Sequence, residues 1–290
     1  MSIRDILVAE KNVLVRADLE WPSYADASAG RRKATHEIIE YLRIRGAKRI
    51  KVIGHKGNID QVSELGVDLN FDLRSDLREE ANDPTLAREL ALGFDVYINE
   101  AFASSHRKHC SIVALPHLMK SQGKQVGMGL RFEKEITHLS IPSLESREGK
   151  GRVIIIGGAK ASDKVKYADS LETKGWTVLR GGLLSGVDLR PDGLDISQSL
   201  ISDYQSLVSY ADTIVITGPL GKYEEVPDGT REVFTAVANS KAYKIAGGGD
   251  TEAALEKFGL KEKFDWISVG GGAMLEYFAS GTLAALEVFQ

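Results

Sequence analysis

The feature that most constrains the fold is a repeated pattern in the C-terminal half, where a short apolar run ends in glycine and a helical stretch follows. Five such runs occur in succession: Val153–Ile156, Thr177–Leu179, Thr213–Thr217, Tyr243–Ala246 and Trp266–Val269. The clearest helical stretches are Thr251–Phe258 and Ala273–Phe278. Strand-like runs that alternate with helical ones are typical of βα units, whose strands pair in parallel. The pattern predicts an α/β domain with a parallel sheet.

The N-terminal half shows a weaker version of the same pattern. Its predicted strands are Asn12–Arg16, Arg49–Ile53 and Asp95–Asn99. A helical stretch, His36–Arg45, lies between the first two strands and ends at Gly46, a good C-cap residue. The polar segment Ile141–Arg152 is rich in glycine, proline and serine, and it predicts a linker between the two halves.

Composition limits the class of protein. A chain of 290 residues forms one large or two ordinary domains. Its single cysteine, Cys110, excludes an internal disulfide and fits a reducing cytoplasm, either as a reactive thiol or, more commonly, as a small buried residue. A net charge of −4 argues against a dedicated nucleic-acid binder, and no apolar run is long enough for a signal peptide or a membrane span. The six histidines are scattered and show no zinc-binding spacing.

The glycines at the strand ends indicate a phosphate site. In a parallel sheet, ligands bind beyond the carboxyl ends of the strands. Glycine lets the backbone approach a ligand closely. The following helices offer free N–H groups and a partial positive charge to an anion. Tight packing between strand and helix explains a single glycine equally well, but five glycine-bearing turns on one edge favour a binding site.

Two of these turns also carry charged residues. In GGAKASDK, Lys160 and Lys164 are four residues apart and would share a face of a helix that begins there. Lysines here would neutralise phosphate, although a single lysine is more often solvated surface. In GGGDT, Asp250 is either a helix N-cap or, beside a phosphate chain, a ligand of Mg²⁺.

Cationic residues recur at strand ends and loops of the N-terminal half. They are Arg16, Arg31, His55, Lys56, His106 and Arg107. Together they would form a pocket for a small anionic substrate, whereas each taken alone would more often be a surface charge.

Several motifs, in order along the chain, resemble those of phosphoglycerate kinases. Val13–Pro22 (VLVRADLEWP) resembles the family's VLVRVDFNVP, and Tyr97–Ser111 (YINEAFASSHRKHCS) resembles YVNDAFGTAHRAHAS. Ile155–Lys164 (IIGGAKASDK) is similar to ILGGAKVSDK, and Thr217–Glu224 (TGPLGKYE) is similar to NGPMGVFE. The resemblance continues through AGGGDTEAALEKFGL and SVGGGAMLEYF.

The resemblance implies an α/β fold of two doubly wound domains with parallel sheets, joined by a hinge. Residues 1–142, with a C-terminal tail at about 280–290, would bind 3-phosphoglycerate, and residues 143–279 would bind the nucleotide. The implied reaction moves a phosphoryl group between 1,3-bisphosphoglycerate and ADP, as in glycolysis and gluconeogenesis, with Mg²⁺ and ATP or ADP. Closure of the hinge would bring the two phosphate centres together and exclude water.

Motif positions carry the family's site onto this chain. The implied substrate-binding residues are Asp18, Arg31, His55 and Arg107. The implied catalytic residues are Arg31, Lys160, Gly271 and Gly272, the two glycines opening a helix that faces the transferred phosphate. The implied nucleotide-binding residues are Gly158, Ala159, Lys160, Lys164, Gly181, Gly182, Glu224, Gly248, Gly249, Asp250 and Thr251, with Glu224 on the ribose and Asp250 also the metal ligand.

The chain departs from the family in length and at single positions. Only Val187–Asp212 stands where the family has a longer insertion that supplies much of the adenine pocket, and the N-terminal half is abbreviated between Asn58 and about Asp72. Point changes leave Glu20, Asn58, Glu100 and Thr217 where the family has asparagine, arginine, aspartate and asparagine. A further substrate arginine of the family has three candidate matches: Arg147, Lys150 and Arg152.

Two of these changes weaken the expected substrate site. The arginine lost at Asn58 and the carboxylate gained at Glu20 would together cost about 3–6 kcal/mol of binding, at roughly 1.5–3 kcal/mol for each hydrogen bond to a charged group. Compensation by Lys56 or Arg32, or a local arginine partner for Glu20, would reduce the penalty.

Two alternatives therefore stay open beside a phosphoglycerate kinase. One is a kinase of the same class with another carboxylate substrate or phosphoryl donor, and the other is a non-catalytic nucleotide- or anion-binding protein on this fold. In each case we expect a cytoplasmic protein that binds small molecules and neither nucleic acid nor membrane. The resemblance implies a monomer.

Overall fold

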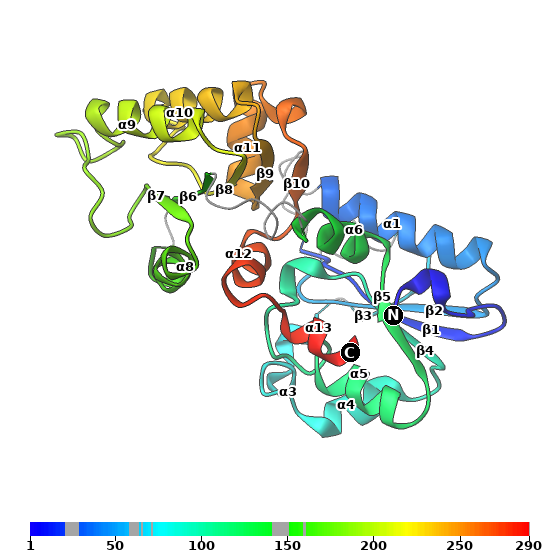
Figure 1. Ribbon diagram of the computed structural model, residues 1–290. Coiled ribbons are helices and arrows are strands. Elements are labelled where there is room, and N and C mark those ends of the chain that lie inside the picture. The colour runs from blue at the N-terminus through cyan, green and yellow to red at the C-terminus, as the bar shows by residue number, and fades with distance from the viewer. Residues whose placement is uncertain are drawn as a thin grey trace. The chain divides into compact units, whose positions relative to one another are not determined.

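The structure, a computed structural model, describes residues 1–20, 29–57, 64, 66–70, 72–140, 151–158 and 161–289. The chain divides into two compact units: unit 1 is Met1–Leu139 with Ser280–Gln290, and unit 2 is Ser140–Ala279. Each unit is built on a sheet of five parallel strands (Figure 1). The predicted α/β class with two parallel sheets is therefore confirmed.

The sheet of unit 1 has the strand order β3-β2-β1-β4-β5. Its strands are β1 (Asn12–Arg16), β2 (Arg49–Ile53), β3 (Asp68–Asn70), β4 (Val96–Asn99) and β5 (Gln125–Met128). The first two match their predicted bounds, and β4 begins one residue after the predicted start. Sequence reasoning missed β3 and β5. β3 is only three residues long, too short to show an alternation of apolar and polar residues, and Gly127 interrupts the apolar pattern of β5.

Alternate residues of β1 serve opposite faces of this sheet. Val13 and Val15 pack in one buried cluster with α1 (Ala29–Ile44), whereas Leu14 packs in another with α4 (Pro84–Ala91). Figure 1 shows α1 and α6 on one side of the sheet and α4 and α5 on the other. The remaining helical elements of unit 1 are η1 (Ile3–Asp5), η3 (Leu73–Ser75), α3 (Leu77–Glu80), η4 (Phe102–Ser104), α5 (Ala114–Ser121), α6 (Leu130–Leu139) and α13 (Ala284–Phe289).

The end of α1 follows local rules. The helix begins seven residues before the predicted His36, at Ala29, and ends at Ile44. Gly46 follows with a left-handed φ of 77°, and its N–H donates to the Arg43 carbonyl at 3.0 Å. Glycine adopts this conformation without a Cβ clash, so the predicted C-cap is confirmed.

The sheet of unit 2 has the strand order β10-β9-β8-β6-β7. Its strands are β6 (Arg152–Ile156), β7 (Thr177–Arg180), β8 (Thr213–Thr217), β9 (Tyr243–Gly247) and β10 (Trp266–Ser268), all within one residue of the predicted runs. Its helices are α8 (Ala161–Thr173), α9 (Gln198–Ser209), α10 (Asp228–Asn239), α11 (Gly249–Lys257), η5 (Lys261–Lys263) and α12 (Gly271–Ser280). Both predicted helices, α11 and α12, begin two residues earlier than expected.

The C-terminal helix α13 packs on unit 1. The Ala285 N–H donates to the Ser105 carbonyl at 3.1 Å, and Lys120 Nζ donates to the Val288 carbonyl at 3.1 Å. The ring of Phe289 meets Phe132 edge-on, with centroids 6.2 Å apart. These contacts join the last residues of the chain to the core around α5 and α6.

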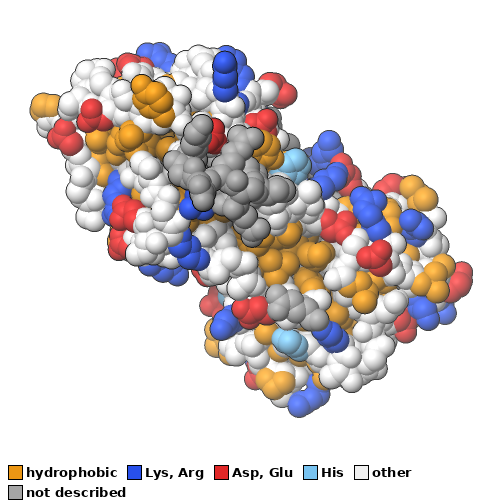
Figure 2. All heavy atoms as spheres, viewed as in Figure 1, with side chains coloured by type: hydrophobic (Ala, Val, Ile, Leu, Met, Phe, Trp, Pro, Cys, Tyr) orange, Lys and Arg blue, Asp and Glu red, His pale blue; other side chains and the backbone are white. Residues whose placement is uncertain are grey.

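The charged side chains on the surface are mixed in sign. On the face drawn in Figure 2, basic and acidic side chains are interspersed and neither sign forms a large patch. Every helix among the described residues is too short or too polar to span a bilayer.

Cys110 is buried, and burial raises the pKa of its thiol to about 12, so it behaves as a small core residue and not as a nucleophile.

Glu100 is buried beneath the start of α6. Its Oε1 accepts the Arg131 N–H at 2.8 Å, whereas Oε2 has no partner among the described residues. Gly129 leaves room for this oxygen, which a Cβ at that position would overlap. Burial raises the pKa of Glu100 well above the ordinary 4.5, although helix N–H groups and the charge of Arg131 oppose the shift and Glu37 adds to it. The folded protein therefore binds this proton more tightly than the unfolded chain.

Replacing Glu100 with glutamine is expected to flatten the pH dependence of stability. Because the folded-state pKa is raised, the wild-type free energy of unfolding falls as pH rises above the ordinary value of 4.5, until Glu100 itself ionises. The slope is at most about 1.4 kcal/mol per pH unit. Urea unfolding should show that the free energy of unfolding of Glu100→Gln rises relative to that of the wild type as the pH is raised from about 4 to about 8. Parallel profiles for the two proteins would contradict this account, and the exposed Glu40→Gln serves as control, with a change within about 0.5 kcal/mol.

Candidate active site

Both sheets have a switch point where a ligand site is expected. In unit 1 the chain leaves β1 for β2 on one side and later returns to β4 on the other side. In unit 2, β6 is flanked in the same way by β7 and β8. Loops on either side of such a point diverge at the carboxyl ends of the strands and leave a crevice. A cavity lies at this edge in each unit.

The cavity of unit 1 has a volume of about 100 Å³. Its lining residues are Arg16, Asp18, Leu19, Glu20, Arg31, His55, Ala103, Ser104 and Arg107. All four residues predicted to bind substrate are among them, whereas the other two cationic candidates, Lys56 and His106, do not line it. Three arginines face two carboxylates, a balance that suits an anionic ligand.

Arg16 is the buried centre of this pocket, with 1% of its surface exposed. Its Nε donates to Ser111 Oγ at 2.9 Å, Nη2 donates to Ser104 Oγ at 3.1 Å, and Nη1 donates to the Ala17 carbonyl. Nη1 also lies 3.8 Å from Asp18 Oδ1. Arg16 therefore ties the end of β1 to the loops that follow β4.

Asp18 is held by the same loops. Its Oδ2 accepts the Ala103 N–H at 2.9 Å, and its Oδ1 accepts the Ser104 hydroxyl at 2.5 Å. These bonds orient the carboxylate at the pocket wall.

Glu20 has a local arginine partner. Its Oε1 lies 3.6 Å from Nη1 of Arg74, and its backbone carbonyl accepts Nη1 of Arg31 at 3.2 Å. Arg32, one of the two residues expected to compensate, forms an ion pair with Glu64. The favourable case that the sequence left open, in which Glu20 pairs with an arginine, is the arrangement observed. Asn58 lies outside the described residues.

His55 is oriented by a residue that sequence reasoning missed. Nε2 of His55 lies 2.8 Å from Oε1 of Glu79, a fully buried carboxylate at the end of the short helix α3. Glu79 also accepts the N–H and the hydroxyl of Ser111, at 2.9 and 2.6 Å. Nothing in the local pattern around LREE distinguishes Glu79 from a surface glutamate, because its burial depends on loops far away in the chain.

The cavity of unit 2 is larger, at about 280 Å³, and more apolar. Its lining residues are Gly158, Gly182, Leu183, Leu189, Gly193, Leu194, Pro219, Leu220, Gly221, Lys222, Tyr223, Glu224 and Asp250. Four predicted nucleotide-binding residues are among them: Gly158, Gly182, Glu224 and Asp250. The other predicted residues of this unit that the structure describes, Lys164, Gly181, Gly248, Gly249, Thr251, Gly271 and Gly272, do not line it. Ala159 and Lys160 lie outside the described residues.

The glycine turns pack against one another. The Gly158 N–H donates to the Pro219 carbonyl at 2.7 Å, and the Gly182 N–H donates to the Leu220 carbonyl at 2.6 Å. A Cβ at Gly182 would lie 2.6 Å from the Gly158 carbonyl oxygen. Close packing therefore requires glycine at position 182, whereas the left-handed φ of 93° favours glycine at position 158, and both residues also line the cavity. Packing and ligand access, which the sequence presented as alternatives, occur together here.

Lys164 and Thr251 bridge these turns. Lys164 Nζ donates to the Gly157 carbonyl at 2.5 Å and to the Thr217 carbonyl at 3.4 Å. The Thr251 hydroxyl accepts the Gly218 N–H at 2.7 Å and donates to the Gly247 carbonyl at 2.9 Å. Thr251 is buried, and its hydroxyl joins the end of β8 to the end of β9.

Asp250 is exposed in the first turn of α11 and is not the N-cap, because Gly248 occupies that position. The N-cap alternative for Asp250 is therefore wrong. The carboxylate lines the cavity instead, where its oxygens suit a hard divalent cation such as Mg²⁺. The start of α12 lies close by, since a Cβ at Gly271 would come within 2.9 Å of the Gly247 carbonyl oxygen.

A short hairpin within Val187–Asp212, where the family has a longer insertion, supplies one wall of the cavity. Leu189 and Ile196 form an antiparallel bridge, and the Lys222 N–H donates to the Leu194 carbonyl at 2.8 Å. The buried carboxylate of Asp195 accepts the Gly229 N–H at 2.7 Å and so joins the hairpin to the start of α10. Sequence reasoning missed Asp195, because its partner lies 34 residues away.

The two doubly wound units, one with a cationic pocket and one with a glycine-lined cavity, define an α/β phosphotransferase. A family model described as "Phosphoglycerate kinase" matches residues 70–201 and 184–281. The phosphoglycerate kinase of Acidobacterium capsulatum is 30% identical over 99% of this chain and 98% of its own length. That of Thermomicrobium roseum is 30% identical over 79% of this chain and 72% of its own. The chain belongs to the phosphoglycerate kinase family.

Solved structures agree on the fold. The phosphoglycerate kinase of Pyrococcus horikoshii superposes with a TM-score of 0.81 at 24% identity, covering 100% of this chain and 98% of its own. The enzyme of Coxiella burnetii gives a TM-score of 0.79 at 23% identity, with coverage of 99% and 97%. The family model and the curated relatives confirm the resemblance seen in the motifs, and as a member of this family the chain is a kinase that transfers phosphate to a carboxylate.

The chain is a shortened member of the family. The alignment with the Acidobacterium relative spans 403 positions, whereas this chain has 290 residues, so at least 113 positions (403 − 290) fall in gaps of this chain. The shortness expected from the motif spacing is confirmed.

Proposed function

We propose that this chain transfers a phosphoryl group reversibly between 1,3-bisphosphoglycerate and ADP, with 3-phosphoglycerate and ATP as the reverse pair. The observation that carries the proposal is the cationic pocket of unit 1, where four residues assigned from separate segments of the chain line one cavity. The negative charge of Glu20 disfavours binding of this anionic substrate less than an unpaired carboxylate would, because it is paired with Arg74. The same proposal treats the protein as a cytoplasmic monomer, as the family resemblance implies.

The pocket of unit 1 would bind the acid. Arg31 and Arg107 would neutralise its anionic groups, and His55, oriented by Glu79, would donate a hydrogen bond. Asp18, held by the Ala103 N–H and the Ser104 hydroxyl, would accept from a substrate hydroxyl. Binding the acid in one orientation presents its carboxylate to the incoming phosphoryl group.

The cavity of unit 2 would bind the nucleotide. The apolar wall from the hairpin and Leu220 suits the base, and Glu224 at the rim suits the ribose hydroxyls. The phosphates would lie along the glycine turns and Lys164. Asp250 would hold Mg²⁺, which neutralises phosphate charge when it is bound. Enzymes of this type mainly position reactants and neutralise charge, so transfer requires the two ligands to meet, the step assigned to hinge closure.

The test is Mg²⁺-dependent formation of acyl phosphate from ATP and 3-phosphoglycerate, trapped with hydroxylamine. The wild type is expected to give trapped product, and Lys160→Ala should lower the rate by about 10²–10³-fold, as loss of one donor to a developing charge does. Arg107→Ala should instead raise KM for 3-phosphoglycerate by roughly 10–100-fold, the equivalent of one hydrogen bond to a charged group, with KM for ATP unchanged.

Two results would overturn the proposal. Trapped product with other carboxylic acids but not with 3-phosphoglycerate would indicate a kinase with a different acceptor. Saturable nucleotide binding without turnover on any acid of the panel would indicate a binding protein on this fold.

A further inference from the structure

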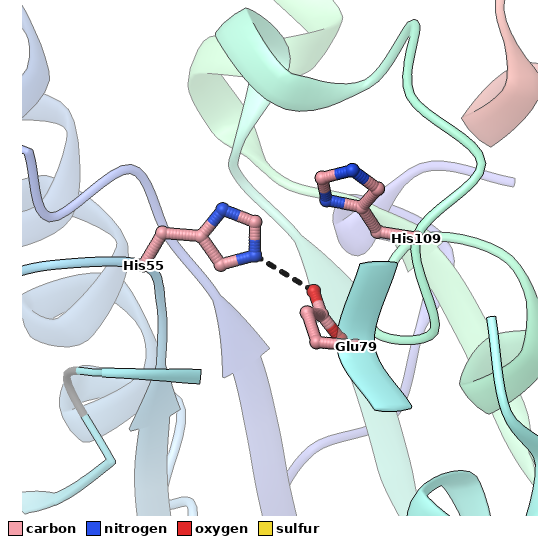
Figure 3. A group of neighbouring side chains, drawn as sticks. All are labelled: His55, Glu79 and His109. Carbon is pink, nitrogen blue, oxygen red and sulfur yellow. Dashed lines mark hydrogen bonds and ion pairs between the residues drawn. The ribbon is translucent and has the colours of Figure 1, made fainter. Parts of the chain in front are cut away.

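Three side chains from separate segments converge beside the pocket of unit 1 (Figure 3). His55 follows β2, Glu79 lies in α3, and His109 lies in the loop after η4. Each offers one ligand atom, and these three atoms all lie within 4.8 Å of one another. The rings of His55 and His109 face each other at a tilt of 36°, with centroids 5.2 Å apart. In Figure 3 the ring of His109 faces both the imidazole of His55 and the carboxylate of Glu79.

Glu79 supplies the negative charge of this cluster. Burial by itself raises the pKa of its carboxyl, but hydrogen bonds from His55 and Ser111, together with the charge of Arg16, outweigh burial and hold the pKa below its ordinary value. The carboxylate is therefore ionised and fully buried. The bonds from Ser111 fix its orientation, as outer partners do for metal-binding carboxylates.

His109 supplies an unused nitrogen. Its Nδ1 is buried and has no hydrogen-bond partner among the described residues. Burial, followed by the charge of His55, lowers the pKa of His109 to about 4, so the ring is neutral at physiological pH. A buried neutral imidazole without a partner is costly unless something occupies its lone pair.

We propose that His55, Glu79 and His109 form a binding site for a divalent transition-metal ion of the zinc class. Two imidazoles and one carboxylate are a known zinc ligand set with an open fourth position. Mg²⁺ is disfavoured, because it prefers oxygen ligands, so this site is separate from the one proposed at Asp250. Cys110, next in the chain, is not the fourth ligand, because its thiol donates to the Asp83 carbonyl at 3.2 Å.

Binding of an ion would change the spacing of the ligand atoms. Ligand bonds of about 2.0–2.1 Å in a tetrahedral arrangement place ligand atoms roughly 3.3 Å apart. Nε2 of His55 and Oε1 of Glu79 are 2.8 Å apart, so this pair must open by about half an ångström as the ion replaces the shared proton. The displaced proton moves to Nδ1 of His55 or to solvent. The positive charges of Arg16 and Arg107 oppose the ion and make the site weaker than a closed structural zinc site.

An ion at this place would act on the substrate pocket. His55 lines that pocket, and its orientation depends on the bond to Glu79 that the ion would replace. Occupancy would therefore alter binding of the acid without contact to the nucleotide cavity.

The test is titration of the chelator-treated full-length protein with Co²⁺ as a spectroscopic probe and with Zn²⁺ by calorimetry. The wild type is expected to bind one equivalent, with the visible absorption of Co²⁺ bound by nitrogen and oxygen at low coordination number. His109→Ala should lose affinity by more than the roughly 10–100-fold that loss of an outer partner costs. Glu79→Gln, which keeps the side-chain shape, should do the same. The titration needs neither substrate nor activity, so its outcome is independent of the kinase assay.

The matched control is His117→Ala, which removes an exposed histidine of α5. It should bind the ion as the wild type does. Undiminished binding in His109→Ala would overturn the proposal. So would loss of binding in His117→Ala, or a stripped wild type that takes up no Co²⁺ or Zn²⁺. Circular dichroism tests whether the variants are folded. If His109→Ala is not folded, His109→Gln takes its place.

Discussion

Replacing Arg16 with methionine is expected to lower the free energy of unfolding by about 3–5 kcal/mol, the usual result of removing one partner of a buried charge network. The guanidinium is 1% exposed and donates to Ser104, Ser111 and the Ala17 carbonyl. Methionine fills part of the volume but leaves these acceptors without a donor. It also removes the positive charge that helps keep Glu79 ionised. Urea unfolding of the two proteins measures the difference.

The control for Arg16 lies in the same pocket. Arg107 is exposed, so Arg107→Met should change the free energy of unfolding by no more than about 0.5 kcal/mol. Arg16→Lys keeps the charge but not the fork of donors, and should fall between the wild type and Arg16→Met. Equal stabilities for Arg16→Met and Arg107→Met would show that the buried network does not stabilise unit 1.

Replacing Gly218 with alanine is expected to destabilise unit 2 by about 2–5 kcal/mol and to weaken nucleotide binding. Gly218 has a left-handed φ of 91°, which costs a residue with a Cβ about 1–2 kcal/mol. The added Cβ would also overlap the Gly157 carbonyl oxygen and lie 2.8 Å from Lys164 Nζ, and such overpacking costs about 1–3 kcal/mol more. The shift of Lys164 and of the turn after β6 disturbs the glycine-lined wall of the cavity. Urea unfolding and a nucleotide titration measure the two effects.

Gly186 separates the two causes. It has a similar φ of 78°, but a Cβ there would meet nothing within 4 Å. Gly186→Ala should therefore show only the backbone cost of about 1–2 kcal/mol and leave nucleotide affinity unchanged. If Gly218→Ala is no worse than Gly186→Ala, the close approach of the turns does not contribute to stability or to the site.

The sequence by itself determined the strand pattern and the class of fold. In unit 2 all five strands lie within one residue of the predicted runs, because strands buried on both faces are continuous apolar runs that end in glycine. The helix end at Gly46 was predictable for the same local reason, the left-handed cap. The family resemblance also selected four residues that line one cavity.

Only the tertiary structure decided what surrounds those residues. Glu79, Asp195 and the pairing of Glu20 with Arg74 are invisible in local patterns, since their partners are brought near by sheet order and loop packing. The histidines show no zinc spacing, yet His55 and His109 meet across Glu79, although they are 54 residues apart (109 − 55). Strand and helix periodicity is set by neighbours along the chain, whereas burial, pKa and ligand geometry are set by neighbours in space.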